Sequence, residues 1–179
     1  MKAYINSRKW LGRLAVLLAA STFSAQPALA QDTVPLTSDQ QLARDIYRDV
    51  IAFRTARGQQ QVPAMVAYLV DRFKQAGFSD DDIQVTDYDS EGEKTQGLMV
   101  TYRAKPGSTA KPIVLLGHMD VVDALAKDWV RPPFTLTEEE GYFFGRATMD
   151  NKYGITNLTA TFLRLKAEGW QPSRDLVLV

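Results

Sequence analysis

The chain has 179 residues, and its 21 Lys and Arg residues balance its 21 Asp and Glu residues. It contains one histidine and no cysteine, which excludes disulfides and any metal site built on thiolates. After residue 30, acidic residues outnumber basic ones by four, and this balance argues against a nucleic-acid-binding protein, which presents a basic surface. A metal site in this chain would have to use aspartate, glutamate and the single histidine.

Residues 1–30 have the pattern of a secretory signal peptide. A basic start is followed by a short apolar stretch, residues 14–20, and by the small-residue cleavage pattern of residues 28–30. An uncleaved anchor is the alternative, but the apolar stretch is shorter than the roughly 20 residues that a membrane-spanning helix needs. We therefore expect an exported protein, periplasmic or extracellular, with no stable membrane anchor.

Two amphipathic helices are expected after a polar lead-in. Apolar residues recur at helical intervals over residues 38–57, and Ser38 and Gln41 have the spacing of a capping box. The second helix, over residues 62–77, has a proline near its start and Gly77 as its stop signal. Both helices have an adequate structural explanation, and we assign them no chemistry.

Short runs of alternating or continuously apolar residues predict strands, and a further helix is predicted over residues 153–168. The loop expected between the first two strands is EGEKTQG, residues 91–97. Strands that alternate with helices indicate an α/β domain with a mixed, mostly parallel sheet flanked by helices. The predicted strands cover residues 83–88, 97–104, 113–117, 142–146 and 175–179.

The single histidine, His118, directly follows an apolar run that is typical of a strand buried on both faces. Ligands in open α/β sheets bind beyond the carboxyl ends of strands, where this histidine lies. Asp150 has a comparable place between a strand and a helix, and a carboxylate there can bridge two metal ions about 3.5–4 Å apart. Taken singly, His118 also fits a hydrogen-bonded core histidine, and Asp150 fits a helix N-cap.

Taken together, the motifs are more specific. The chain contains LLGHMDVV, then PPF, then EEEGYFFGRATMDNKYG, and then a helix and LVLV. This order resembles the M20 family of zinc-dependent metallopeptidases, which includes glutamate carboxypeptidases, aminoacylases and succinyl-diaminopimelate desuccinylases. The resemblance covers nearly all of residues 31–179 and implies that they form the N-terminal part of an M20-type catalytic domain.

The resemblance implies a role for three side chains. His118 matches the histidine that binds one of two zinc ions, and Asp150 matches the aspartate that bridges both. Asp120 matches the aspartate that orients the metal-bound histidine, a role that agrees with the usual hydrogen bond from a ligating imidazole to a carboxylate. Asp120 also fits a solvated loop carboxylate. The family further implies a cis peptide bond between Asp150 and Asn151.

Some positions depart from the family pattern or carry no assigned chemistry. The family often has a glycine where Ala147 stands, and Arg146 and Lys152 match basic positions that we interpret as structural partners. In the family a Glu-Glu pair, further metal ligands, a second histidine and a lid or dimerisation domain follow the strand that contains LVLV. We therefore expect an inactive fragment that binds metal weakly, with homodimerisation confined to the full-length protein.

The resemblance implies hydrolysis of peptides or N-acyl amino acids with two Zn²⁺ ions, and with Co²⁺ or Mn²⁺ as alternatives. Two other readings of the sequence stay open. One is a non-enzymatic exported α/β binding module in which the three side chains only satisfy hydrogen bonds. The other is a mononuclear metal hydrolase or phosphoesterase, which would need more ligands than this spacing provides. The side-chain preference of the substrate is not predicted.

Overall fold

The computed structural model describes residues 35–179, and the predicted signal peptide, residues 1–30, lies outside the described residues. The first helix, α1 (Ser38–Ala52), begins with a capping box between Thr37 and Gln40, whose side chains each accept a hydrogen bond from the other's backbone N–H. The capping box predicted for Ser38 and Gln41 was therefore wrong by one position. Both pairs have the same spacing, so spacing alone did not distinguish them.

α1 ends at Ala52, five residues before the predicted end, because Phe53 takes an extended conformation. The second helix, α2 (Val62–Gln75), has its proline in the first turn, as predicted. The chain then reverses at Gly77, whose φ of +88° favours glycine. A short 3₁₀ helix, η1 (Asp80–Asp82), leads into the sheet.

The main sheet has four strands in the order β1-β2-β6-β3. β1 (Ile83–Ser90) and β2 (Glu93–Tyr102) form an antiparallel hairpin, β2 pairs antiparallel with β6 (Leu176–Leu178), and β6 pairs parallel with β3 (Ile113–Leu115). The predicted α/β class with a mixed sheet is confirmed. Parallel pairing is less extensive than expected, because the long hairpin contributes most of the paired residues. The loop predicted over residues 91–97 was too long, since β2 already begins at Glu93.

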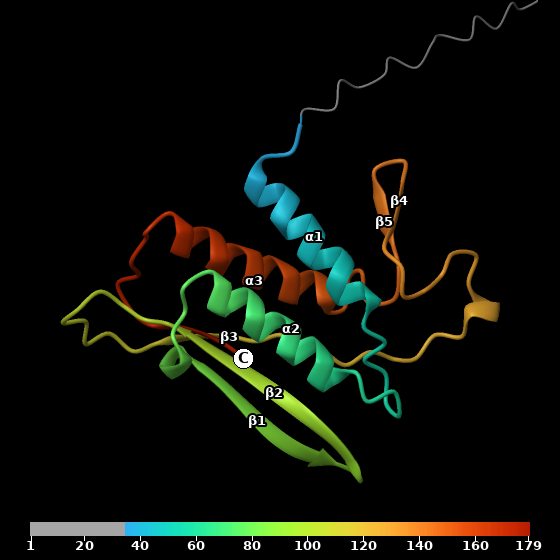
Figure 1. Ribbon diagram of the computed structural model, residues 1–179, viewed down its shortest axis with the longest axis horizontal. Helices are drawn as coiled ribbons and strands as arrows, with labels where there is room; N and C mark the ends of the chain where they lie inside the picture. Colours follow the sequence, from blue (N-terminus) through green and yellow to red (C-terminus); the bar gives the residue numbers. More distant parts are fainter. Residues whose placement is uncertain (1–34) are drawn as a thin grey trace, which may run out of the picture. The chain divides into compact units, whose positions relative to one another are not determined.

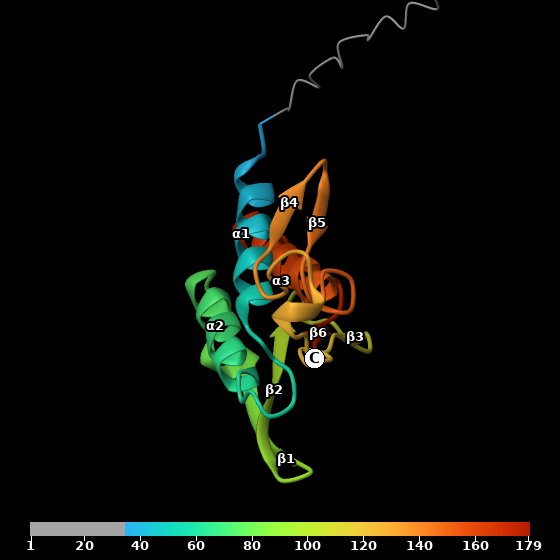
Figure 2. The ribbon, with the colours of Figure 1, turned by 90° about the vertical axis from the view of Figure 1, so that its right-hand side faces the viewer.

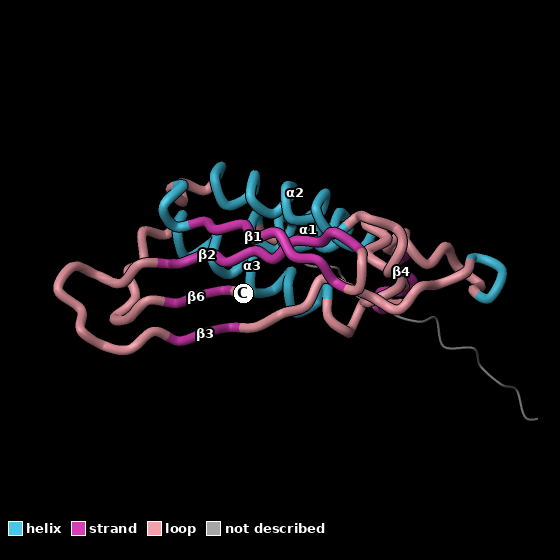
Figure 3. The backbone as a smooth tube through the Cα atoms, turned by 90° about the horizontal axis from the view of Figure 1, so that it is seen from below, coloured by secondary structure: helices cyan, strands magenta, loops and turns pink. Residues whose placement is uncertain are grey.

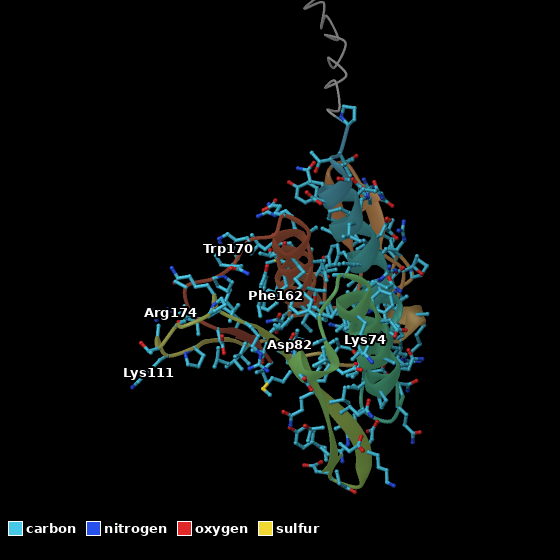
Figure 4. All side chains as sticks on the ribbon, turned by 60° about the vertical axis from the view of Figure 1, so that its left-hand side comes forward. Lys74, Asp82, Lys111, Phe162, Trp170 and Arg174 are labelled. Atoms are coloured by element: carbon cyan, nitrogen blue, oxygen red, sulfur yellow. The ribbon has the colours of Figure 1, made fainter. Side chains whose placement is uncertain are left out.

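The helices α1, α2 and α3 (Lys152–Ala167) lie on one face of this sheet, and the strand order is visible from the opposite face (Figures 1 and 3). Apolar side chains from the helices and from β2 and β6 form the main core. Phe162 on α3 lies between its helix and the sheet (Figure 4), where its ring is 5.7 Å from that of Tyr102 and 6.4 Å from that of Phe78. The fully buried members include Ile46, Val50, Ile51, Met65, Phe73 and Val100.

A second, two-stranded sheet packs beside α1 (Figure 2). Its strands are β4 (Thr137–Glu139) and β5 (Tyr142–Phe144), and a short 3₁₀ helix, η2 (Ala126–Asp128), precedes them. The ring of Phe143 lies edge-on to that of Tyr47 on α1, with 5.4 Å between the ring centres.

The strand before the histidine is less buried than predicted. β3 lies at the end of the strand order, and within residues 35–179 no strand pairs with its outer edge. Val114 is 54% exposed and Ile113 is exposed as well, so the prediction of burial on both faces was wrong for the described residues. None of the described helices has the length and apolar character needed to span a membrane.

Candidate metal centre

His118 lies just beyond the end of β3, next to the start of α3. Gly117 permits this approach, because a Cβ atom at that position would lie 3.1 Å from the Ile155 side chain on α3. Such a contact is tighter than ordinary packing, so a larger residue would require the Ile155 side chain or the strand end to shift by a few tenths of an ångström. The glycine before the histidine thus has a packing role that brings the imidazole close to the beginning of α3.

Asp150 lies immediately before α3, in a loop that is attached to α1. The Tyr47 hydroxyl on α1 donates a hydrogen bond to the Thr148 carbonyl, with 2.6 Å between the oxygens. The Asp150–Asn151 peptide bond is cis, which confirms the expectation taken from the family resemblance. Asn151 holds the N-cap position of α3, so the alternative reading of Asp150 as the N-cap was wrong.

The structure brings all three predicted site residues together. His118 Nε2 lies 2.8 Å from Asp150 Oδ1. On the other side of the ring, Nδ1 lies 3.1 Å from the Asp120 carbonyl oxygen and 3.3 Å from Asp120 Oδ1. The side chains of His118 and Asp150 are 49% and 83% exposed, so the reading of His118 as a core histidine was wrong.

The two carboxylates make this site favourable for a cation. The hydrogen bond to Asp150 raises the pKa of His118 above its usual value, and partial burial opposes that shift. The Asp120 carbonyl and the charges of both aspartates raise this pKa further. The same negative charges would attract a divalent cation that takes the place of a proton on the ring.

The ligand types fit zinc, but the set is small. An imidazole nitrogen and a carboxylate oxygen are ordinary zinc ligands, and Asp120 is placed to fix the imidazole from the other side. Among residues 35–179, no group of three or more His, Cys, Asp or Glu side chains could hold a metal ion. The described residues therefore place one imidazole and one carboxylate within hydrogen-bond distance of each other, fewer ligands than a complete zinc site uses.

A groove of about 620 Å³ adjoins this centre, within the size range of small-molecule sites. His118 and Asp120 are among the residues that line it. Residues of the β1–β2 hairpin, including Tyr88 and Gln96, also line it, as do Thr55 and Arg57. A ligand in this groove would lie directly beside the imidazole.

Two buried polar residues near the centre were not identified as site residues from the sequence. Thr55 is 1% exposed and donates a hydrogen bond to the carbonyl of Met119, next to His118. Lys152 is completely buried, donates a hydrogen bond to the Phe53 carbonyl, and has a pKa that burial lowers to about 8. Lys152 was predicted only as a structural partner, and no sequence signal pointed to Thr55.

Ala147 has a φ of +66°, in the left-handed region where glycine is favoured. This backbone conformation explains why the family often has a glycine at the position. Alanine is accommodated here with its methyl group in a small buried cluster with Ala56 and Val121.

Comparison with known proteins agrees with this geometry. The family model for peptidase family M20/M25/M40 matches residues 114–179, which include both His118 and Asp150. A protein from Staphylococcus aureus named probable succinyl-diaminopimelate desuccinylase is 42% identical over 77 residues. That alignment covers 42% of this chain and 19% of the relative. Residues 114–179 are therefore similar to the M20 peptidase family, and the similarity includes both residues of the candidate centre.

Solved structures give the same fold at low sequence identity. The dipeptidase Dug1p from Saccharomyces cerevisiae matches with a TM-score of 0.64 and 20% identity, over 76% of this chain and 30% of that protein. An M20 metallo-carboxypeptidase from Sulfolobus solfataricus matches with a TM-score of 0.57 and 15% identity, over 76% and 29%. The chain thus spans about a fifth of its curated relative and less than a third of these structures.

Proposed function

We propose that this chain provides part of the active site of a two-zinc M20 hydrolase that cleaves peptides or N-acyl amino acids. The observation that carries the proposal is the 2.8 Å approach of His118 Nε2 to Asp150 Oδ1 within the region that the family model matches. In this proposal His118 binds one zinc ion, Asp150 bridges both, and Asp120 orients the imidazole. Co²⁺ or Mn²⁺ could replace zinc.

The chemistry of these residues follows from their contacts. Zinc bound at the centre would activate a water molecule and polarise the scissile carbonyl. Asp120 is placed to accept the Nδ1 proton of His118, which would leave the Nε2 lone pair free for a bound zinc ion. The adjoining groove can hold a substrate beside that nitrogen.

A two-metal centre needs more ligands than residues 35–179 bring together, and the sequence has only one histidine. We propose that the remaining ligands and the general base come from outside these residues. The 179 residues alone are then expected to bind metal weakly and to hydrolyse no substrate.

The substrate class is proposed from the relatives. The Staphylococcus aureus protein is named for a succinylated amino acid, and the yeast structure is described as a dipeptidase. A succinylated amino acid and a dipeptide each contain an amide bond next to a carboxylate-bearing group. We propose this substrate class for the complete hydrolase.

We also propose that the protein is exported after removal of residues 1–30. The basic start, the apolar stretch and the small-residue pattern of that segment support the proposal. Mass spectrometry of the protein recovered outside the cytoplasm should find Gln31 as its first residue. Recovery only with Met1 in place, or only from the cytoplasm, would contradict export.

Metal binding tests the proposed function. Calorimetric titration of the full chain with Zn²⁺ should detect binding that His118→Ala and Asp150→Asn abolish. Asp120→Asn should weaken binding about tenfold, the lower end of the effect of such orienting residues. Asp128→Asn is a matched control, since Asp128 is an exposed aspartate of helix η2, and it should leave the affinity unchanged. Binding that survives His118→Ala would contradict the assignment.

A hydrolysis assay tests the expected inactivity separately. The full chain should release no amino acid from dipeptides or N-acyl amino acids in the presence of Zn²⁺ or Co²⁺. Turnover that depends on His118 would support the hydrolase and refute the inactivity of the chain. Absence of both metal binding and turnover would instead favour the exported binding module.

A further inference from the structure

The segment Phe53–Ala56, which we call the connecting segment, joins the two parts of the candidate centre. It follows α1 and contacts both the loop that carries His118 (residues 117–123, the His118 loop) and the region that carries Asp150 (residues 145–152, the Asp150 region). Ala56 forms an isolated parallel bridge with Val121 in the His118 loop. The connecting segment is thus placed to set the spacing between the two regions.

Thr55 attaches the connecting segment to the His118 loop. Its hydroxyl donates to the Met119 carbonyl at 2.5 Å, and its own carbonyl accepts from the Val121 N–H at 3.2 Å. These two bonds reach the backbone on either side of Asp120. Because Thr55 is 1% exposed, water has little access to compete for these groups.

Lys152 attaches the same segment to the Asp150 region. Its ammonium group donates to the Phe53 carbonyl, and its backbone is two residues past Asp150. The side chain is completely buried, and an ammonium group is costly to bury without a compensating contact. The Phe53 carbonyl also accepts the Thr55 N–H at 3.0 Å, so Lys152 and Thr55 meet at one acceptor.

Apolar contacts join the same three pieces of chain. Ala56 of the connecting segment, Val121 of the His118 loop and Ala147 of the Asp150 region form a small buried cluster, distinct from the main core. Each piece contributes one residue to it. Polar and apolar contacts therefore hold the same three pieces together.

We propose that Thr55 and Lys152 are positioning residues that hold His118 and Asp150 at the separation needed to share a divalent cation. Thr55 acts through the backbone next to His118, and Lys152 acts through the Phe53 carbonyl on the backbone next to Asp150. This inference rests on the proposed function, because it concerns the same centre. It adds two residues that do not themselves bind the metal.

Four variants of the full chain test the inference. Thr55→Val removes the hydroxyl that holds Met119, and Thr55→Ser retains it. Thr159→Val is the matched control, since Thr159 is also completely buried and its hydroxyl has no hydrogen-bond partner within the described part of the chain. Lys152→Met removes the ammonium group while the Phe53 carbonyl keeps its bond from the Thr55 N–H.

The first measurement is the affinity for Co²⁺, together with the urea unfolding midpoint. Thr55→Val and Lys152→Met should bind Co²⁺ about tenfold more weakly than the parent chain, as expected for residues that support metal ligands. Thr55→Ser and Thr159→Val should stay within about twofold. Lys152→Met should weaken binding without lowering the unfolding midpoint, because it removes a buried charge and leaves no acceptor unpaired. A purely structural role would lower the midpoint and the affinity together.

The second measurement needs no metal and uses the ring signals of His118, which are unambiguous because the chain has one histidine. Their NMR shifts in the metal-free chain should change in Thr55→Val and Lys152→Met and stay at parental values in Thr159→Val. A parent chain that binds no Co²⁺ would refute the proposed function, and these shifts would still decide the positioning roles. If either Thr55→Val or Lys152→Met fails to fold, the other variant tests the inference. Parental Co²⁺ affinity or parental ring shifts in a folded Thr55→Val or Lys152→Met chain would overturn the inference.

Discussion

The core between the three helices and the sheet is closed to solvent, whereas the candidate metal centre at its edge is open. Phe73 and Val100 are completely buried in the core, but Asp150 is 83% exposed. The core is held by apolar and aromatic packing over many residues. The centre is held by a few buried hydrogen bonds, notably those of Thr55 and Lys152. Stability and metal binding should therefore respond to different substitutions.

The largest effect on stability should come from the core. Phe73→Ala removes a fully buried ring that packs against Phe78 and Phe162, and it should lower the free energy of unfolding by about 3–5 kcal/mol. Phe143→Ala, at a partly exposed ring beside α1, should cost clearly less. Urea unfolding measures both changes. Equal losses for the two variants would break the distinction between the core and its edge.

Tyr47 connects the two regions, because its ring is buried in the core as part of α1 and its hydroxyl donates to the Thr148 carbonyl in the Asp150 region. Tyr47→Phe should lower the free energy of unfolding by about 1–2 kcal/mol, since it leaves that carbonyl without its donor. It should also shift the His118 ring signals more than Phe73→Ala does. If the His118 ring signals shift in Phe73→Ala but not in Tyr47→Phe, then Tyr47 does not link the core to the metal centre.

The same tyrosine predicts a response to alkaline pH. Burial raises the pKa of Tyr47 from its usual value of 10 to about 12. Between these two values the unfolded chain loses the hydroxyl proton while the folded chain keeps it, so stability is full below pH 10 and falls as the pH rises toward 12. Tyr47→Phe should show a shallower fall of the unfolding midpoint over that range. Identical slopes for the parent chain and the variant would contradict this reading.

The smallest effect is expected at Ala147, where two contributions oppose each other. Glycine would relieve a left-handed conformation that costs an L-residue about 1–2 kcal/mol, but it would remove a buried methyl group worth about 0.8 kcal/mol. A net gain of less than about 1 kcal/mol in unfolding free energy is expected for Ala147→Gly, by urea unfolding. A loss of unfolding free energy in Ala147→Gly, instead of a gain, would mean that packing in the small cluster around Ala56 outweighs the cost of the backbone conformation.

Local sequence patterns predicted most of the elements of the fold. Helical periodicity and stop signals identified α1, α2 and α3, and alternation identified the β1–β2 hairpin. The errors occurred where a pattern fits two neighbouring choices, as with Thr37 and Ser38 at the first capping box. Burial of β3 was overestimated, because an apolar run carries no information on whether a further strand covers its edge.

The sequence predicted the residues of the site that belong to motifs, but not those that act through hydrogen bonds to backbone carbonyls. His118, Asp120 and Asp150 belong to motifs with a recognisable order, and the structure brings their side chains together. Thr55 and Lys152 act on backbone carbonyls, which every residue has, so no residue pattern marks their partners. Such contacts follow only from the three-dimensional course of the chain.

The most direct test of the shared cation is a crystal structure of the chain grown with Zn²⁺, with anomalous data collected at the zinc absorption edge. We expect an anomalous peak at about 2.0–2.2 Å from both His118 Nε2 and an Asp150 carboxylate oxygen. Zinc bound at other side chains, or a retained direct contact between His118 and Asp150 at saturating Zn²⁺, would contradict it.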